Sequence, residues 1–222
     1  MRRTAIFFLV SLCLAVPAQG EDALGHAAEF YPLTTGSKWT MILDGPRGKM
    51  EMTNSVAGTD EVNGKQLYRL SSSVNGSVVA TEHLQLSESG LSRNQFNGTP
   101  ISPKIMLLPE PVKLGWKWEK KDVKLGEETM DATAEIANKT EKVAVPAGQF
   151  DAIRLTVTAK TKSGDVVSHY WLAKGVGIVK QDMIIGNVKL TLSLAEYEIA
   201  KQGRASEGDP KEEAREEAPA SP

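Results

Sequence analysis

The side chains of this chain best suited to bind a metal or transfer a proton are its three histidines, His26, His83 and His169. They lie far apart, and none has the i, i+4 or short-loop spacing of a metal site. His169 lies beside Tyr170 and Trp171 in the run VVSHYWLA, which has the pattern of a strand. We interpret it as a packed or surface strand residue, with a ligand role as the alternative. We predict no metal site and no cofactor.

Motifs of catalysis are also missing from the sequence. It contains no G-x-S-x-G and no P-loop. The run Gly175 to Lys180, GVGIVK, resembles half of G-x-G-x-x-G but lacks the third glycine, so we interpret it as a hairpin or bulge before a strand at Ile178 to Gln181. Acidic residues are numerous, but no spacing brings two together as in a glycosidase. We therefore predict no catalytic residue.

The tryptophans are the first candidates for ligand binding. Trp116 and Trp118 share one face if their segment is extended, because strand side chains alternate. Together with Trp39 and Trp171 they could line a pocket for a sugar or a lipid. The alternative is that they anchor the core, since aromatic side chains dominate burial in β-proteins.

The second candidate is an apolar segment rich in proline. Four prolines punctuate Thr99 to Leu114, and an apolar patch lies between them, formed by Ile105, Met106, Leu107 and Leu108. Proline cannot donate to a strand ladder, so we predict a loop or an edge here and not a central strand. Such a segment would cover a hydrophobic cavity or plug the core.

The elements that must position these residues have the period of β-strands. Apolar residues alternate with polar ones over Met130 to Ile136, Ile153 to Ala159 and Val188 to Leu194. After Leu194 the phase slips by one residue, which predicts a β-bulge near Ala195. The fold class is therefore mainly β: a single antiparallel curved sheet, half-barrel or barrel, with few short helices.

Turn residues separate the expected strands. Asp44-Gly45-Pro46, Asn63-Gly64, Asn75-Gly76 and Ser163-Gly164-Asp165 all favour tight reversals. A Pro, Gly, Trp pattern with identical spacing occurs twice, in YPLTTGSKW and in PVKLGWKW. It suggests two sub-structures that begin alike, with coincidence as the alternative.

The two ends of the chain differ from its middle. Residues 1–20 have the basic start, short apolar run and small residues of a signal peptide cleaved near Gly20, and the only cysteine, Cys13, lies within it. We expect a flexible start over 21–29, a β-rich domain over 30–200 and a disordered acidic tail over 201–222. The expected location is the periplasm or the extracellular space.

Four segments carry a family resemblance. YPLTTGSKW, LPEPVKLGWKW, VPAGQFDAIRL and YWLAKGVGIVK make the chain similar, from Tyr31 to about Glu198, to the TapB-like exported bacterial proteins of unknown function. The resemblance implies a β-rich fold, curved like that of periplasmic lipoprotein carriers, and no catalytic residues.

Three functions remain open at this stage. The leading hypothesis is a non-enzymatic binding module of the bacterial cell envelope, for a lipid or other apolar ligand or for an envelope protein. The second is a structural or assembly module that acts through a sheet edge or the tail. The third is a hydrolase with His83 or His169 beside acidic residues in a cleft. With 26 basic and 28 acidic residues and no basic stripe, the chain should not bind nucleic acid, and it should be peripheral to a membrane at most.

Overall fold

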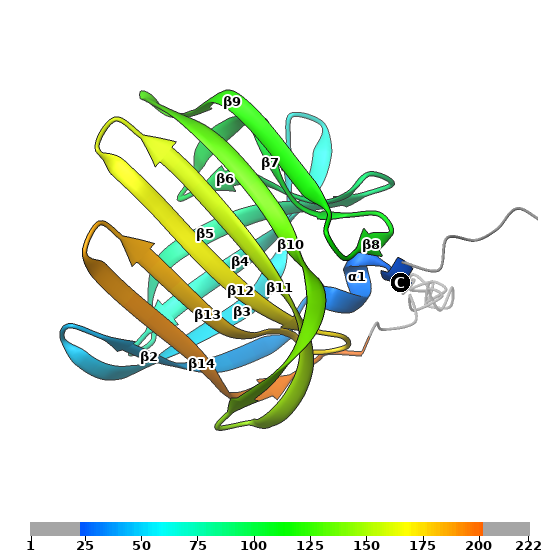
Figure 1. The fold of residues 1–222 in the computed structure, drawn as a ribbon, viewed down its shortest axis with the longest axis vertical. Coiled ribbons are helices and arrows are strands. Elements are labelled where there is room, and N and C mark those ends of the chain that lie inside the picture. Colours follow the sequence, from blue (N-terminus) through cyan, green and yellow to red (C-terminus); the bar gives the residue numbers. More distant parts are fainter. Residues whose placement is uncertain (1–22, 202–222) are drawn as a thin grey trace, which may run out of the picture.

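The fold is a closed antiparallel barrel of twelve strands, with a two-stranded sheet and one short helix beside it (Figure 1). This computed structural model describes residues 23–201. The expected mainly-β class is confirmed. The elements are β1 (Ala23–Gly25), α1 (Ala27–Phe30), β2 (Lys38–Gly45), β3 (Gly48–Val62), β4 (Lys65–Val74), β5 (Ser77–Ser87), β6 (Gly90–Phe96), β7 (Thr99–Pro109), β8 (Val112–Lys113), β9 (Lys117–Leu125), β10 (Glu128–Val145), β11 (Gly148–Thr161), β12 (Gly164–Ala173), β13 (Gly177–Ile185) and β14 (Val188–Glu198).

Alternation in the sequence becomes the inner and outer faces of the barrel. The apolar residues of Met130 to Ile136 are all buried, and those of Ile153 to Val157 are too. The bulge expected near Ala195 is present, since the register of β14 with β2 shifts between Leu194 and Glu196. Asn63 and Gly64 both have positive φ, as a two-residue hairpin of type I′ requires.

The barrel consists of two six-strand meanders, β2–β7 and β9–β14, which begin in the same way. Gly36 donates its N–H to Val56 O, and Gly115 donates its N–H to Ala137 O. In each half the second strand also donates a hydrogen bond to the residues before the first strand. Val56 N–H donates to Ser37 O, and Ile136 N–H donates to Trp116 O. The repeated Pro-Gly-Trp pattern thus marks equivalent entries into β2 and β9.

Because the strands run up and down, the barrel has two distinct ends. The helix end carries α1, and the hairpin end carries the turns β2–β3, β4–β5, β6–β7, β9–β10, β11–β12 and β13–β14 (Figure 1). Two contacts hold α1 against the β12–β13 turn. Gly175 N–H donates a hydrogen bond to Glu29 O at 2.7 Å, and Lys174 forms an ion pair with Glu29 at 3.1 Å.

Residues 23–29, which lie in the segment 21–29 that the sequence predicts to be flexible, take part in this closure. Ala23 and Gly25 pair with β8, and Ala27 is fully buried. The Ala27 N–H donates to Glu110 Oε2 at 3.0 Å. These partners lie more than eighty residues away in the sequence, so no local pattern announces them.

The prediction of a loop or edge at the proline-rich segment is corrected: Thr99–Pro109 forms β7. It pairs with β6, and only Ile101 and Ser102 pair with β9. Residues 101–104 of β7 have no partner on β6, because Gln95 pairs with Pro100 and Arg93 pairs with Ile105. This irregularity is a wide bulge in β7. Pro103 lies inside that bulge, where no ladder donor is required of it.

The expected signal peptide over 1–20 and the acidic tail, apart from Lys201, lie outside the described residues. Among residues 23–201, no helix has the length and apolar character needed to cross a bilayer.

Candidate functional site

The interior of the barrel changes character along its axis. On β14 the inward residues are Leu194, Leu192, Leu190 and Val188 in order from the helix end, since Leu192 pairs with Leu43 on one side and Gln181 on the other. Their exposed fractions are 0% for Leu194 and 3% for Leu192, whereas Val188 reaches 43%. The core is therefore packed under α1 and opens to solvent at the hairpin end.

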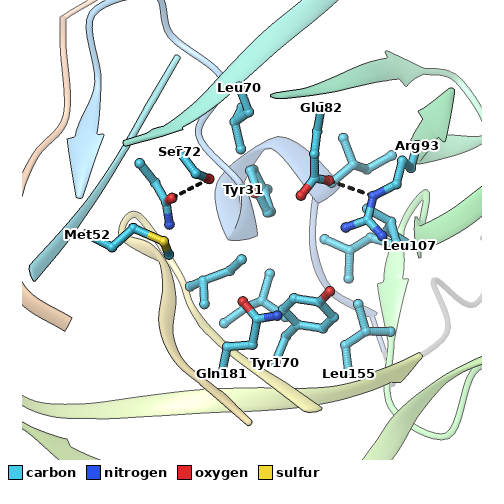
Figure 2. Close-up of a pocket in the computed structure, with 15 residues that line it drawn as sticks. Tyr31, Met52, Leu70, Ser72, Glu82, Arg93, Leu107, Leu155, Tyr170 and Gln181 are labelled. Atoms are coloured by element: carbon cyan, nitrogen blue, oxygen red, sulfur yellow. Dashed lines mark hydrogen bonds and ion pairs between the residues drawn. The ribbon is translucent and has the colours of Figure 1, made fainter. Parts of the chain in front are cut away.

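A cavity of about 70 Å³ lies in the interior between these two zones (Figure 2). A water occupies roughly 30 Å³ in the liquid, so this space alone suits a small polar group and not a whole lipid. A smaller void of about 20 Å³ adjoins it and shares Tyr31, Asn54, Leu70 and Ile178 with it. The cavity wall consists of Tyr31, Met52, Asn54, Leu70, Ser72, Glu82, Leu91, Arg93, Leu107, Leu108, Leu155, Tyr170, Leu172, Ile178 and Gln181.

One ion pair stands in this largely apolar wall. Arg93 Nε donates to Glu82 Oε2 at 2.6 Å, and the side chains are 17% and 25% exposed. Burial is the largest single influence on the pKa of Arg93 and lowers it, but Glu82, Tyr170 and Tyr31 together outweigh burial, so the pKa lies above its ordinary value. Arg93 is therefore charged at neutral pH.

The other polar groups of the cavity are uncharged. Ser72 Oγ donates to Asn54 Oδ1 at 2.7 Å on one wall, and Tyr170 and Gln181 project from the opposite wall (Figure 2). Burial raises the pKa of Tyr31, so its phenol stays protonated throughout the neutral range. The cavity thus offers hydroxyl and amide groups around a single neutralised ion pair.

Nearer the hairpin end, a wider recess of about 340 Å³ lies between the β2–β3 hairpin and β14. Leu43, Met50, Val188 and Leu190 supply its apolar side chains. Met52 of the cavity and Met50 of the recess are two positions apart on β3, so both face the same side of the strand. The apolar recess therefore continues the inner face that lines the cavity.

Only some of the predicted ligand-binding residues line the cavity. Leu107 and Leu108 line the cavity, whereas Ile105 is buried in the core and Met106 is half-buried. Trp116 and Trp118 are half-buried and pack against the core. The apolar patch is thus a strand of the cavity wall.

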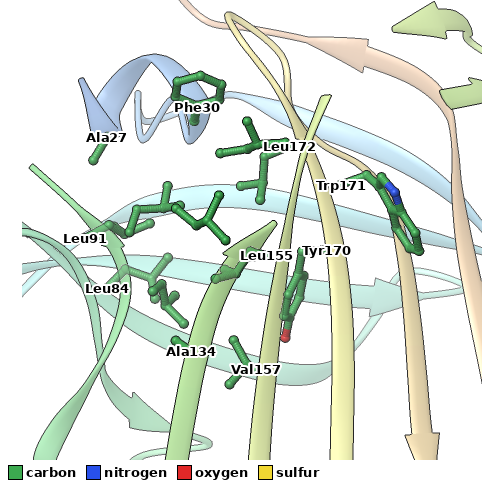
Figure 3. Close-up of a cluster of buried hydrophobic side chains, with 14 of the residues drawn as sticks. Ala27, Phe30, Leu84, Leu91, Ala134, Leu155, Val157, Tyr170, Trp171 and Leu172 are labelled. Carbon is green, nitrogen blue, oxygen red and sulfur yellow. The ribbon is translucent and has the colours of Figure 1, made fainter. Parts of the chain in front are cut away.

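Trp171 lies on the other face of its strand. Tyr170 and Leu172 line the cavity, and alternation places Trp171 between them outward (Figure 3). Its Nε1 donates to Glu141 Oε2 at 2.8 Å, and Lys180 Nζ lies 4.6 Å from the ring centroid. Long charged side chains therefore cover it, and it does not join the cavity.

The histidines also lie apart from the cavity. His83 Nε2 is 2.7 Å from Asp60 Oδ2, and Arg69 binds the same carboxylate at 2.9 Å. The hydrogen bond from His83 is the main reason that the pKa of Asp60 is lowered. His169 bonds Thr156 Oγ1 at 2.9 Å. Neither histidine lines the cavity or the recess, and residues 23–201 hold no cluster of three or more His, Cys, Asp or Glu suited to a metal.

Sequence reasoning missed the ion pair, although a signal for it was present. Glu82 shares its strand face with Leu84 and Leu86, and Arg93 shares its face with Leu91. A charged residue in register with leucines on the inward face marks a buried charge, which needs a partner.

Three solved structures resemble this fold. A protein described as a lipoprotein from Parabacteroides distasonis is 16% identical, with 76% of this chain and 98% of that chain covered and a TM-score of 0.42. An exported protein with a YmcC-like fold from Bacteroides fragilis is 12% identical, with coverage of 76% and 98% and a TM-score of 0.39. The hypothetical lipoprotein YmcC from Escherichia coli is 9% identical, with coverage of 77% and 88% and a TM-score of 0.35.

No curated protein matches the chain. The TapB-like name suggested by the sequence finds no support in these comparisons. A family model does match, the one described as DUF3108-like, over residues 48–192, which is more than half of the chain. It spans β3 to the middle of β14 and includes most of the cavity wall. The chain belongs to the DUF3108-like family.

Proposed function

We propose that this protein is an exported, non-enzymatic binding module of the bacterial cell envelope that admits an apolar ligand into its barrel from the hairpin end. The observation that supports this most is the exposure of inward apolar side chains, which rises along β14 from 0% at Leu194 to 43% at Val188. Apolar side chains that face inward but remain wet gain free energy when a ligand covers them. Export rests on the N-terminal sequence, with its short apolar run before small residues.

The two other functions have less support. The barrel pairs its strands on both sides except along most of the β7–β9 seam, where only Ile101 and Ser102 pair, so it leaves little free edge for an edge-binding module. A hydrolase would need a histidine beside a carboxylate in a cleft, and the His83–Asp60 pair lies outside both the cavity and the recess.

The test is uptake of the uncharged apolar dye N-phenyl-1-naphthylamine by the purified protein. Val188→Asp places a carboxylate inside the recess, which Arg47 also lines, and we expect dye affinity to fall at least about tenfold, since the apolar dye must displace the water around these charges. Ile184→Asp is the matched control, because Ile184 neighbours the inward Ile185 and therefore faces outward.

The proposal requires that Ile184→Asp keep wild-type affinity while Val188→Asp loses it. Equal affinity in all three proteins, or no dye uptake by the wild type, would reject binding through the hairpin end. Native mass spectrometry with organic extraction of protein from a periplasmic fraction then shows whether a lipid is carried in the cell.

A further inference from the structure

The ion pair in the cavity wall is better explained by recognition than by stability. A buried pair adds little stability, and well-packed apolar residues of similar volume often do as well or better. Here the pair borders empty space, where Leu107, Leu155 and Leu172 form much of the wall. A barrel selected only for a filled core would have no use for Glu82 and Arg93 at this position.

The charges of the cavity sum to zero. Of the residues that line it, only Glu82 and Arg93 are ionised, and they bond each other at 2.6 Å. A ligand carboxylate beside Arg93 would also lie beside Glu82, so attraction and repulsion would largely cancel while the cost of desolvation remained. A ligand ammonium group would meet the same balance with the signs reversed.

Uncharged polar groups face no such penalty. A guanidinium has five N–H donors. In Arg93 the Nε–H donates to Glu82, and the terminal amino groups lie on the side facing Tyr170 (Figure 2). An ester carbonyl could accept hydrogen bonds from this guanidinium and from the Tyr170 hydroxyl. Ligand hydroxyls could bond the amides of Asn54 and Gln181.

Volume and polarity then divide the ligand into two parts. The cavity of about 70 Å³ is the smaller and more polar space. The recess of about 340 Å³ at the hairpin end has the apolar side chains of Leu43, Met50, Val188 and Leu190 in its wall, with Arg47 beside them. A compact polar head would occupy the first, and a hydrocarbon chain would extend along the inner face of β3 into the second.

We propose that the barrel selects single-chain lipids with an uncharged ester and hydroxyl head, of the monoacylglycerol type, and discriminates against free fatty acids through the neutral Glu82–Arg93 pair. This inference rests on the proposed function, because it specifies the ligand of the same interior. It predicts a specificity that can be reversed by changing one charge.

The test is titration calorimetry at pH 8 with 1-monodecanoylglycerol and with sodium decanoate, each below its micelle concentration, on delipidated protein. The wild type should bind monodecanoylglycerol at least about tenfold more tightly than decanoate. Glu82→Gln leaves Arg93 unbalanced, so decanoate affinity should rise at least about tenfold and the preference should disappear or invert. Glu61→Gln, the same charge change at an exposed position of β3, should leave both affinities unchanged.

A second variant covers the case in which Glu82→Gln does not fold, which circular dichroism would reveal. The double variant Glu82→Gln, Arg93→Gln is again neutral and should keep the wild-type preference for the uncharged head. A wild type that prefers decanoate, or single and double variants with the same preference, would overturn the inference. If the wild type takes up N-phenyl-1-naphthylamine but does not distinguish the two lipids, the head-group assignment alone is wrong; if it takes up none of the three probes, the proposed function is wrong as well.

Discussion

At the scale of single residues, the environment of His169 makes the stability of this protein depend on pH. Burial lowers the pKa of His169 from 6.5, and the nearby Arg154 cation lowers it further. The folded state therefore binds a proton less readily than the unfolded chain. Stability is fully present above pH 6.5 and decreases as the pH falls from there towards the lowered pKa of the folded state.

Replacing this histidine should remove that dependence. We expect the free energy of unfolding of the wild type, measured in urea, to fall between pH 7.5 and 5.5 relative to that of His169→Gln. The side chain is partly exposed, so screening keeps the difference below about 1 kcal/mol. Parallel curves for the two proteins over this range would show that His169 has the same proton affinity folded and unfolded.

At the scale of elements, tight contacts between neighbouring strands decide which glycines are replaceable. Gly90 opens β6 with a φ of +117°, and a Cβ there would collide with the carbonyl oxygen of Leu108 on β7. Gly48 opens β3 with a φ of +89° but has open space around it. The two positions share a strained backbone for an L-residue and differ in the collision.

We therefore expect Gly48→Ala to cost about 1–2 kcal/mol from backbone strain alone. Gly90→Ala should cost at least about 2 kcal/mol more, since β7 must shift to admit the methyl group. Urea unfolding of both variants measures the difference. Equal losses would mean that the approach of β6 to β7 is looser than the structure shows.

At the scale of the whole molecule, α1 closes one end of the barrel. Phe30 is 5% exposed and lies against the interior cluster that includes Leu155 and Leu172 (Figure 3). Phe30→Ala should therefore destabilise the entire barrel, by about 3–5 kcal/mol for loss of a buried aromatic ring. Phe96 is 37% exposed near the hairpin end, so Phe96→Ala should cost less than about 0.5 kcal/mol.

Thermal unfolding followed by circular dichroism compares the two variants. If Phe30→Ala unfolds at the temperature of Phe96→Ala, the helix end does not depend on α1. A lower transition only for Phe30→Ala would show that the short N-terminal segment belongs to the cooperative unit of the barrel.

Much of the fold could be read from the sequence because its signals are local. The alternation over Met130 to Ile136 predicted a strand with one buried face, and Asn63-Gly64 predicted a two-residue turn. The phase slip after Leu194 predicted a bulge, which the pairing of β14 with β2 confirms. Each of these depends on residues within a few positions of one another.

The candidate site could be predicted only in part. Leu107 and Leu108 were identified and do line the cavity. Trp171 was identified with them, but alternation turns it outward and directs its neighbour Tyr170 inward. The period of two along a strand therefore shows which face a residue occupies better than the size of its side chain does.

By itself the sequence determined the strands over Met130 to Ile136, Ile153 to Ala159 and Val188 to Leu194 together with their buried faces, and the tight turns between strands, since these follow from neighbouring residues. Only the tertiary structure decided that the sheet closes, that α1 is held by Glu110 and Gly175, and that Glu82 meets Arg93. The last contact depends on a bulge between His83 and Leu84, which shifts how β5 faces β6. The closed sheet, the helix that covers its end and the buried ion pair all depend on contacts between segments far apart in the sequence. A local pattern misses such contacts because the register between strands is fixed by how the strands pack together.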